Sequence, residues 1–254
     1  MLFFTLSFSV WICALLGEEE SAHEPRITLS MVVHNEASRY LKQVLLSVKP
    51  VIERAVIIDD ASTDNTVELC REVLSPVPLT LIVNASSKFS NEIELRKQQW
   101  EETIKTNPEW ILSLDADEVF EDAFAYTIQP LLAKTQVDAY YFRLYDFWDE
   151  KHYREDSYRM ALAYSRPSLM RYKKDVPYTW EETPQHCGRF PKTIFQFSMA
   201  TSPLRLKHYG WAKEEDRKAK YERYKRLDPE AKYGWKEQYD SILDLSPRLV
   251  RWQD

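Results

Sequence analysis

The stretch Trp110-Ile-Leu-Ser-Leu-Asp-Ala-Asp-Glu118 runs an apolar segment directly into two carboxylates, Asp115 and Asp117. A short apolar run with little polar interruption is typical of a central strand in a parallel sheet, covered on both faces. Side chains two residues apart on a strand point the same way, so an extended backbone would bring both carboxylates together. Such oxygen ligands suit Mg²⁺ or Mn²⁺, with phosphate oxygens of a substrate completing the shell. Asp-x-Asp alone is a weak signal, because acidic residues at strand ends also cap helices or face water.

The sequence before this stretch alternates between strand and helix patterns. Strands are predicted over residues 26–33, 55–59, 79–83 and 110–114, and helices over 40–48, 66–74 and 90–105. This alternation with short connections predicts βαβ units and an α/β fold with a mostly parallel, doubly wound sheet. Ligands of such sheets bind outside the carboxyl ends of the strands. The polar residues that directly follow these strands are therefore predicted to share one rim: His34, Asn35, Glu36, Asp59, Asp60, Asp115 and Asp117.

The glycine content limits how this rim can hold phosphate. The chain has four glycines, and they form neither a Gly-x-Gly-x-x-Gly turn nor a P-loop. A phosphorylated ligand would therefore need a metal held by carboxylates rather than a glycine-rich backbone nest.

Composition places the chain among ordinary globular proteins. A net charge of −6 gives no reason to expect nucleic acid as a partner. The three cysteines are far apart and have neither a zinc spacing nor a disulfide framework, which favours a reducing compartment.

Residues 1–25 form an apolar and then acidic N-terminal segment. The apolar part, residues 1–16, is shorter than the roughly 20 residues of a membrane helix. No lysine or arginine precedes it, as one would in a signal peptide. Three interpretations of this segment stay open: a weak membrane-surface anchor, a poorly ordered tail or a misassigned start.

The regular alternation of strand and helix patterns ends after residue 120. A helix is predicted over residues 121–134, kinked or split at Pro130, and a strand over residues 138–147. An irregular, aromatic-rich region follows, in which Trp148, Trp180 and Trp211 are expected in the core rather than as sugar platforms. A charged helix over residues 212–227 is interpreted as solvated.

Three ordered motifs resemble the successive signatures of the inverting family 2 glycosyltransferases of bacterial type. They are Val32-Val-His-Asn-Glu36, Asp59-Asp-Ala-Ser-Thr-Asp-Asn-Thr66 and Leu114-Asp-Ala-Asp-Glu118. The resemblance covers about residues 26–121. It implies the GT-A nucleotide-sugar-binding fold and sugar transfer from a nucleotide-sugar donor, a UDP-sugar, to an acceptor hydroxyl. Residues 26–254 are then one domain, with a nucleotide-binding half (26–121) and an acceptor-binding half (122–254).

The resemblance also implies roles for particular residues. Asp60 would read the uracil between Val32 and His34, and Arg96 would lie near the diphosphate. The implied nucleotide-binding set is Val32, His34, Glu36, Asp60, Arg96 and Asp115. The implied metal ligands for Mn²⁺ or Mg²⁺ are Asp115 and Asp117, with Asp117 the more direct one. His208, in a His208-Tyr-Gly-Trp211 stretch that resembles a later motif of bacterial members, is either a third ligand or a buried histidine.

Inverting transfer needs one general base to deprotonate the acceptor. The His-Glu pair usual in the family is not present, and the nearest equivalents lie in the loop Tyr178-Thr-Trp-Glu-Glu-Thr-Pro-Gln-His-Cys-Gly-Arg189. Glu182 is the first candidate, His186 the second and Glu181 the third, because loops on a rigid scaffold often carry such groups. Both glutamates have a solvated surface role as the alternative.

Two other functional classes stay open at this level. A sugar-phosphate nucleotidyltransferase shares the alternating layout and the acidic metal site, but it usually has a glycine-rich basic loop after the first strand. A non-catalytic nucleotide-sugar-binding protein is the second, and the intact Asp-x-Asp argues against it. The expected partners are a nucleotide sugar and a carbohydrate, lipid-linked or protein acceptor. The expected location is the cytoplasm, including the inner face of the membrane.

Overall fold

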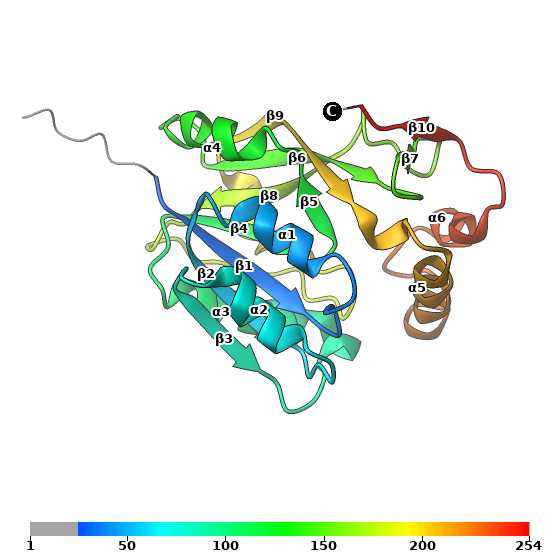
Figure 1. Cartoon of the computed structure of the whole chain (residues 1–254), viewed down its shortest axis with the longest axis horizontal. Helices are drawn as coiled ribbons and strands as arrows, with labels where there is room; N and C mark the ends of the chain where they lie inside the picture. The colour runs from blue at the N-terminus through cyan, green and yellow to red at the C-terminus, as the bar shows by residue number, and fades with distance from the viewer. Residues whose placement is uncertain (1–24, 254) are drawn as a thin grey trace, which may run out of the picture.

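The computed structural model describes residues 25–253 (Figure 1). The expectations for residues 1–24 therefore lie outside the described residues. The first half contains the predicted alternation, with bounds β1(Ile27–Val33), α1(Leu41–Val48), β2(Ile52–Asp59), α2(Thr66–Leu74), β3(Leu79–Val83), η1(Phe89–Asn91), α3(Glu92–Ile104) and β4(Trp110–Asp115). Every predicted strand and helix of this half is confirmed, although β2 begins at Ile52 rather than at residue 55.

The second half is more irregular. Its elements are β5(Glu118–Phe120), α4(Phe124–Leu132), β6(Ala139–Asp146), β7(His152–Arg154), β8(Ser165–Arg171), η2(Lys192–Gln196), β9(Met199–His208), η3(Tyr209–Trp211), α5(Glu214–Leu227), α6(Lys236–Asp240), η4(Ser241–Leu243) and β10(Leu249–Arg251). The strand predicted over residues 138–147 is confirmed as β6. The split expected at Pro130 is not observed, because α4 is short and proline near its end removes a single backbone hydrogen bond.

One eight-stranded sheet runs through both halves, in the order β3-β2-β1-β4-β8-β6-β9-β5. The strands from β3 to β4 are all parallel, as is the pair β6 and β9. The antiparallel pairs are β4 with β8, β8 with β6, and β9 with β5. The mostly parallel sheet predicted from the sequence is therefore confirmed, with antiparallel strands in its second half.

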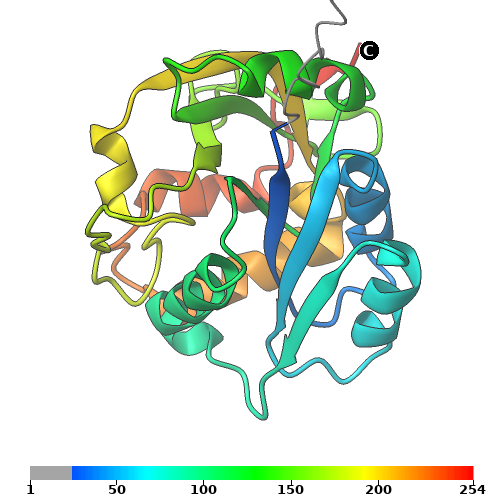
Figure 2. The same ribbon diagram turned by 90° about the vertical axis from the view of Figure 1, so that its left-hand side faces the viewer.

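Helices cover both faces of the parallel part, as a doubly wound sheet requires. Figure 2 shows α1 and α2 on one face and α3 on the other. The covering explains why β1 and β4 are apolar along almost their whole length and buried from end to end. On α1, the buried residues Leu41, Val44, Leu45 and Val48 recur at helical spacing and form the face toward the sheet.

Three tryptophans of the second half pack as expected. Trp148, Trp180 and Trp211 are buried, which confirms their placement in the core. Among residues 25–253, no helix is long and apolar enough to cross a membrane.

Candidate active site

The carboxyl ends of β1 and β4 lie side by side, with Val32 paired to Asp115. Here the chain departs from the extended form assumed for Asp-x-Asp. The strand β4 ends at Asp115, residues 116 and 117 form a turn, and β5 starts at Glu118. The Glu118 carboxylate stabilises this turn by accepting the Asp115 backbone N–H at 3.1 Å. The expectation that the two aspartates converge on one side is therefore wrong, because the backbone turns between them.

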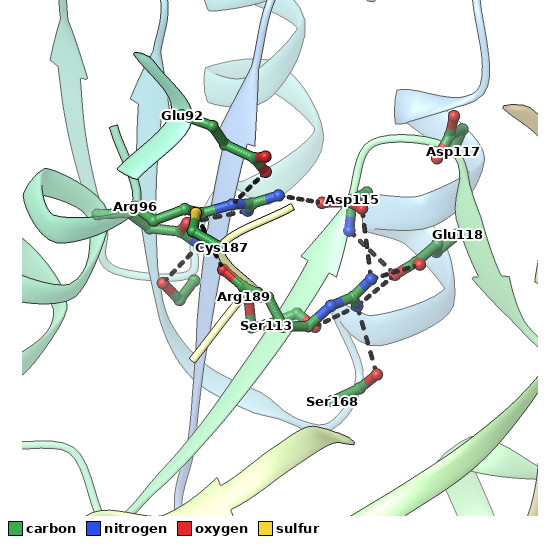
Figure 3. A network of polar contacts seen from close by, with 12 residues as sticks. Glu92, Arg96, Ser113, Asp115, Asp117, Glu118, Ser168, Cys187 and Arg189 are labelled. Carbon is green, nitrogen blue, oxygen red and sulfur yellow. Dashed lines mark hydrogen bonds and ion pairs between the residues drawn. The ribbon is translucent and has the colours of Figure 1, made fainter. Parts of the chain in front are cut away.

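Asp115 lies between two arginines. Its Oδ1 accepts from Arg96 at 3.2 Å and its Oδ2 from Arg189 at 3.3 Å. Burial raises the pKa of the Asp115 carboxyl, but the guanidinium groups of Arg189 and Arg96 outweigh this effect. Together they lower the pKa of Asp115 to about 2. Figure 3 shows Asp117 apart from this group, on the far side of the turn. Arg96 lies next to the Asp-x-Asp segment through this contact with Asp115.

Arg189 is a site residue that the sequence did not reveal. It forms two parallel hydrogen bonds of 2.7 Å to the carboxylate of Glu118, and it also donates to the Ser113 carbonyl at 3.1 Å. Glu118 is 1% exposed, so its charge depends on this partner. Arg189 ends the loop that carries the candidate bases and ties that loop to β4.

We expect Arg189→Met to lower the free energy of unfolding by about 3 kcal/mol, because it leaves the buried Glu118 charge without its partner. Chemical denaturation measures this loss. The double variant Arg189→Met with Glu118→Gln removes the orphaned charge and should be more stable than the single variant. A single variant as stable as the parent would contradict a structural role for the pair.

Asp117 faces a different set of partners. Its Oδ1 lies 3.5 Å from His208 Nε2, and His208 Nδ1 lies 2.6 Å from Asp146 Oδ1. Burial lowers the pKa of the His208 imidazole, but the carboxylates of Asp117 and Asp146 outweigh this effect. Together they raise the pKa of His208 to about 9. His208 is a half-buried histidine with a carboxylate on each side, and Asp146 at the end of β6 orients it.

Because Gly210 has no side chain, three polar side chains can pack closely around its Cα. A Cβ placed on Gly210 would lie 2.3 Å from Asp117 Oδ2, 2.7 Å from His208 Nε2 and 2.1 Å from Lys220 Nζ. The Lys220 ammonium also forms an ion pair with Asp117 at 3.6 Å. We call this group, the side chains of Asp117, His208 and Lys220 packed around Gly210, the cradle.

The cradle contains two side chains that could bind a divalent cation, Asp117 and His208. The Asp117 carboxylate is a donor that Mn²⁺ or Mg²⁺ prefers, and the His208 imidazole nitrogen is a softer donor beside it. A cation bound to the imidazole must displace its proton. Among residues 25–253, no three His, Cys, Asp or Glu side chains are grouped to hold an ion by themselves. A cation here would therefore rely on Asp117, His208 and oxygens of a ligand, while Asp115 is held by its two arginines.

The helix α5, most of whose residues are exposed or half-buried, contributes two side chains to the site. Asp216 is buried and accepts from Arg39 at 2.6 Å, and Arg39 in turn pairs with Glu36 at 2.9 Å. Lys220 lies one turn further along α5 and reaches the cradle. Burial raises the pKa of Glu36 to about 7 despite Arg39. Glu36 therefore links the end of β1 to α5.

Two predicted base-reading residues are together at the neighbouring edge. His34 Nδ1 lies 2.7 Å from the Asp60 carbonyl oxygen. The Asp60 carboxylate is fully buried and accepts from Asn84, Ser87 and the backbone of Lys88 at 2.6–3.2 Å. A base can reach this carboxylate only by replacing one of those donors.

The three candidate bases lie in the loop that α3 supports. Glu182 is exposed and pairs with Lys97 of α3 at 2.7 Å, and Glu181 is exposed and 3.8 Å from Lys192. His186 is held at 2.6 Å from the Tyr239 hydroxyl, and burial lowers the pKa of its imidazole. The two glutamates are thus exposed to solvent with lysines beside them, whereas His186 is tied to α6.

Comparisons with known proteins agree with this architecture. Residues 28–198 match Glycosyl transferase family 2. The SPbeta prophage-derived glycosyltransferase SunS of Bacillus subtilis is 28% identical over 109 residues, which are 43% of this chain and 24% of SunS. An uncharacterized protein of Mycobacterium tuberculosis is 26% identical over 232 residues, 85% of this chain and 54% of that protein. The chain thus spans about half or less of the length of these relatives.

Solved structures show the same fold. TarS of S. aureus has a TM-score of 0.54 at 14% identity, covering 86% of this chain and 42% of TarS. The complex of TarS 1–349 with UDP-GlcNAc has a TM-score of 0.52 at 12% identity, covering 86% of this chain and 70% of that one. The chain belongs to glycosyl transferase family 2, and its fold is the GT-A fold predicted from the three motifs.

Proposed function

We propose that the chain transfers a sugar from a UDP-sugar to an acceptor hydroxyl with inversion, assisted by Mn²⁺ or Mg²⁺. The observation that carries this proposal is the cradle, whose donor atoms lie beside the carboxyl ends of β1 and β4, where such sheets bind ligands. Family membership supports glycosyl transfer, and a complex of UDP-GlcNAc with the similar TarS 1–349 supports a uridine donor.

Different residues of this chain would bind different parts of the donor. Asp117 and His208 would hold the cation, which supplies positive charge to the departing diphosphate. The Lys220 ammonium, 3.6 Å from Asp117, adds positive charge on the same side. Arg96 and Arg189 fix Asp115 beside them. At the other end of the donor, the uracil would lie by Val32 and His34 and donate its N–H to Asp60 in place of Ser87 or Asn84.

Glu182 is the proposed general base. It would leave Lys97, accept the proton of the acceptor hydroxyl and so allow attack from the face opposite the diphosphate. The ion pair is exposed, so separating it costs little. The acceptor would bind against the second half of the chain. Because the donor is a cytoplasmic metabolite, we place the reaction in the cytoplasm.

We expect UDP with Mn²⁺ to raise the melting temperature and UDP alone to do so much less, because no glycine nest holds the phosphates. At about 100 times the dissociation constant, binding adds about 2.7 kcal/mol to the free energy of unfolding. Thermal denaturation with UDP, Mn²⁺ and both together measures this. Equal shifts by UDP with and without metal would contradict the assignment of Asp117 as a ligand.

A second measurement tests the reaction itself. A set of nucleotide sugars incubated with Mn²⁺ and the enzyme should release nucleoside diphosphate from one of them, and proton NMR of the released sugar reports whether its anomeric configuration inverts. Release of pyrophosphate from a nucleoside triphosphate and a sugar phosphate would instead indicate a nucleotidyltransferase.

A further inference from the structure

A cavity of about 330 Å³ lies on the other side of His208 from the cradle. It is formed by the end of β6, the chain between β7 and β8, the start of β8 and the segment around α6. The side chains that matter for its chemistry are Asp146, Tyr158, Arg159, Tyr164, Arg166 and Trp235. None of these residues belongs to the motifs that identify the family.

Two arginines of this cavity have unused donors. Arg159 is 7% exposed, and within residues 25–253 its guanidinium makes no hydrogen bond; its one ion pair is to Asp146 at 3.4 Å. Arg166 is exposed, and its side chain makes no hydrogen bond or ion pair to residues 25–253, although its backbone pairs with Phe142. Arg154 also lines the cavity, but Asp156 and Asp244 already bind it.

The negative charge in the cavity wall is already paired with positive side chains. Asp146 is the one carboxylate among the described lining residues, and it shares its charge between Arg159 and His208. The two arginines therefore leave a net positive surface. Guanidinium groups bind phosphate and carboxylate in the same planar, two-point geometry.

Aromatic rings form the rim beside these arginines. Tyr158 and Trp235 have ring centroids 5.6 Å apart, Trp235 is 44% exposed and Tyr164 is 66% exposed. Trp148, Trp180 and Trp211, by contrast, are buried. Exposed rings beside polar groups provide apolar faces on which a sugar ring can stack.

The cavity and the cradle share a wall. Asp146 lines the cavity and lies 2.6 Å from His208, whose other ring nitrogen is 3.5 Å from Asp117. A molecule in the cavity is therefore separated from the donor site by the side chain of His208. This proximity fits the second substrate of the transfer reaction.

We propose that this cavity binds the acceptor and that the acceptor is an anionic carbohydrate, a sugar or polyol bearing a phosphate or carboxylate group. The inference rests on the proposed function and specifies its acceptor. Arg166 and Arg159 bind the anion, and Trp235 and Tyr158 contact the carbohydrate. The hydroxyl to be glycosylated faces the shared wall at Asp146 and His208, on the side of the cavity nearest the donor.

The test is a set of binding titrations with matched probes. Glucose, glucose 6-phosphate and glucuronate, and the same three forms of galactose and mannose, are titrated into the full chain in the presence of UDP and Mn²⁺. Arg166→Gln removes the free guanidinium. Arg143→Gln is the control, because Arg143 lies on β6 between the cavity-lining Leu144 and the buried Phe142, is exposed, and points to the other face of the strand.

We expect an anionic probe to bind more tightly than its neutral counterpart, and Arg166→Gln to weaken that binding about tenfold while Arg143→Gln changes it little. The tighter of the phosphate and carboxylate probes identifies the anion. Equal binding of neutral and anionic probes, no binding of any anionic probe, or equal losses in the two variants overturns the proposal. The affinity for UDP, measured in the same samples, reports separately on the proposed donor site.

Discussion

Gly210→Ala is expected to remove metal-dependent UDP binding and to lower turnover of the donor by roughly 10³-fold, because loss of the cation removes several kcal/mol of stabilisation from the diphosphate. The added methyl group would lie 2.3 Å from Asp117 and 2.7 Å from His208, so these donors and a cation cannot all keep their positions. Calorimetric titration with UDP and Mn²⁺, together with an assay of UDP release, measures the effect.

This result has an internal control. Without metal, parent and variant should bind UDP equally weakly, because the methyl group blocks only the cradle. Chemical denaturation checks that the fold survives, as expected for a change whose nearest neighbour is the end of the flexible Lys220 side chain. Metal-dependent UDP binding at the parent's affinity in Gly210→Ala would show that the cation lies elsewhere.

Glu182→Gln should lower UDP release from the donor by roughly 10² to 10⁴-fold while metal-dependent UDP binding is retained. Glutamine keeps the size of the side chain but cannot accept the proton of the acceptor or of water. The rate of UDP release and the affinity for UDP are measured on the same preparation. The pattern differs from that of Gly210→Ala, in which binding and turnover fall together.

Glu181→Gln is the matched control, since it makes the same change at the neighbouring exposed carboxylate. It should turn over at close to the parent rate. His186→Ala tests the remaining candidate, whose imidazole is held by Tyr239. A large, binding-neutral defect in either of these variants, with Glu182→Gln near the parent rate, would reassign the base and leave the donor site as proposed.

The strands and helices of the first half could be predicted from the sequence because each is marked by a local pattern of apolar residues. Each strand from β1 to β4 is rich in apolar residues, and the helices between them repeat apolar residues at helical spacing, so these strands and α-helices were predicted. In the second half, β8 contains Pro167 and β9 contains Pro203, and both are rich in polar residues. Their pairing with β6 includes register shifts near these prolines, so their partners decide that they are strands.

The sequence by itself determined the doubly wound parallel sheet, the rim at its carboxyl end and the three motifs that identify the family. These follow from period and order along the chain, which local physics sets. Only the tertiary structure decided the chemistry of the rim. The turn after Asp115 gives Asp117 and Asp115 different partners, and residues more than seventy positions away, Arg189 and Lys220, complete the two sets. Contacts between segments so far apart leave no periodic trace in a sequence, because each depends on where the whole chain places its partner.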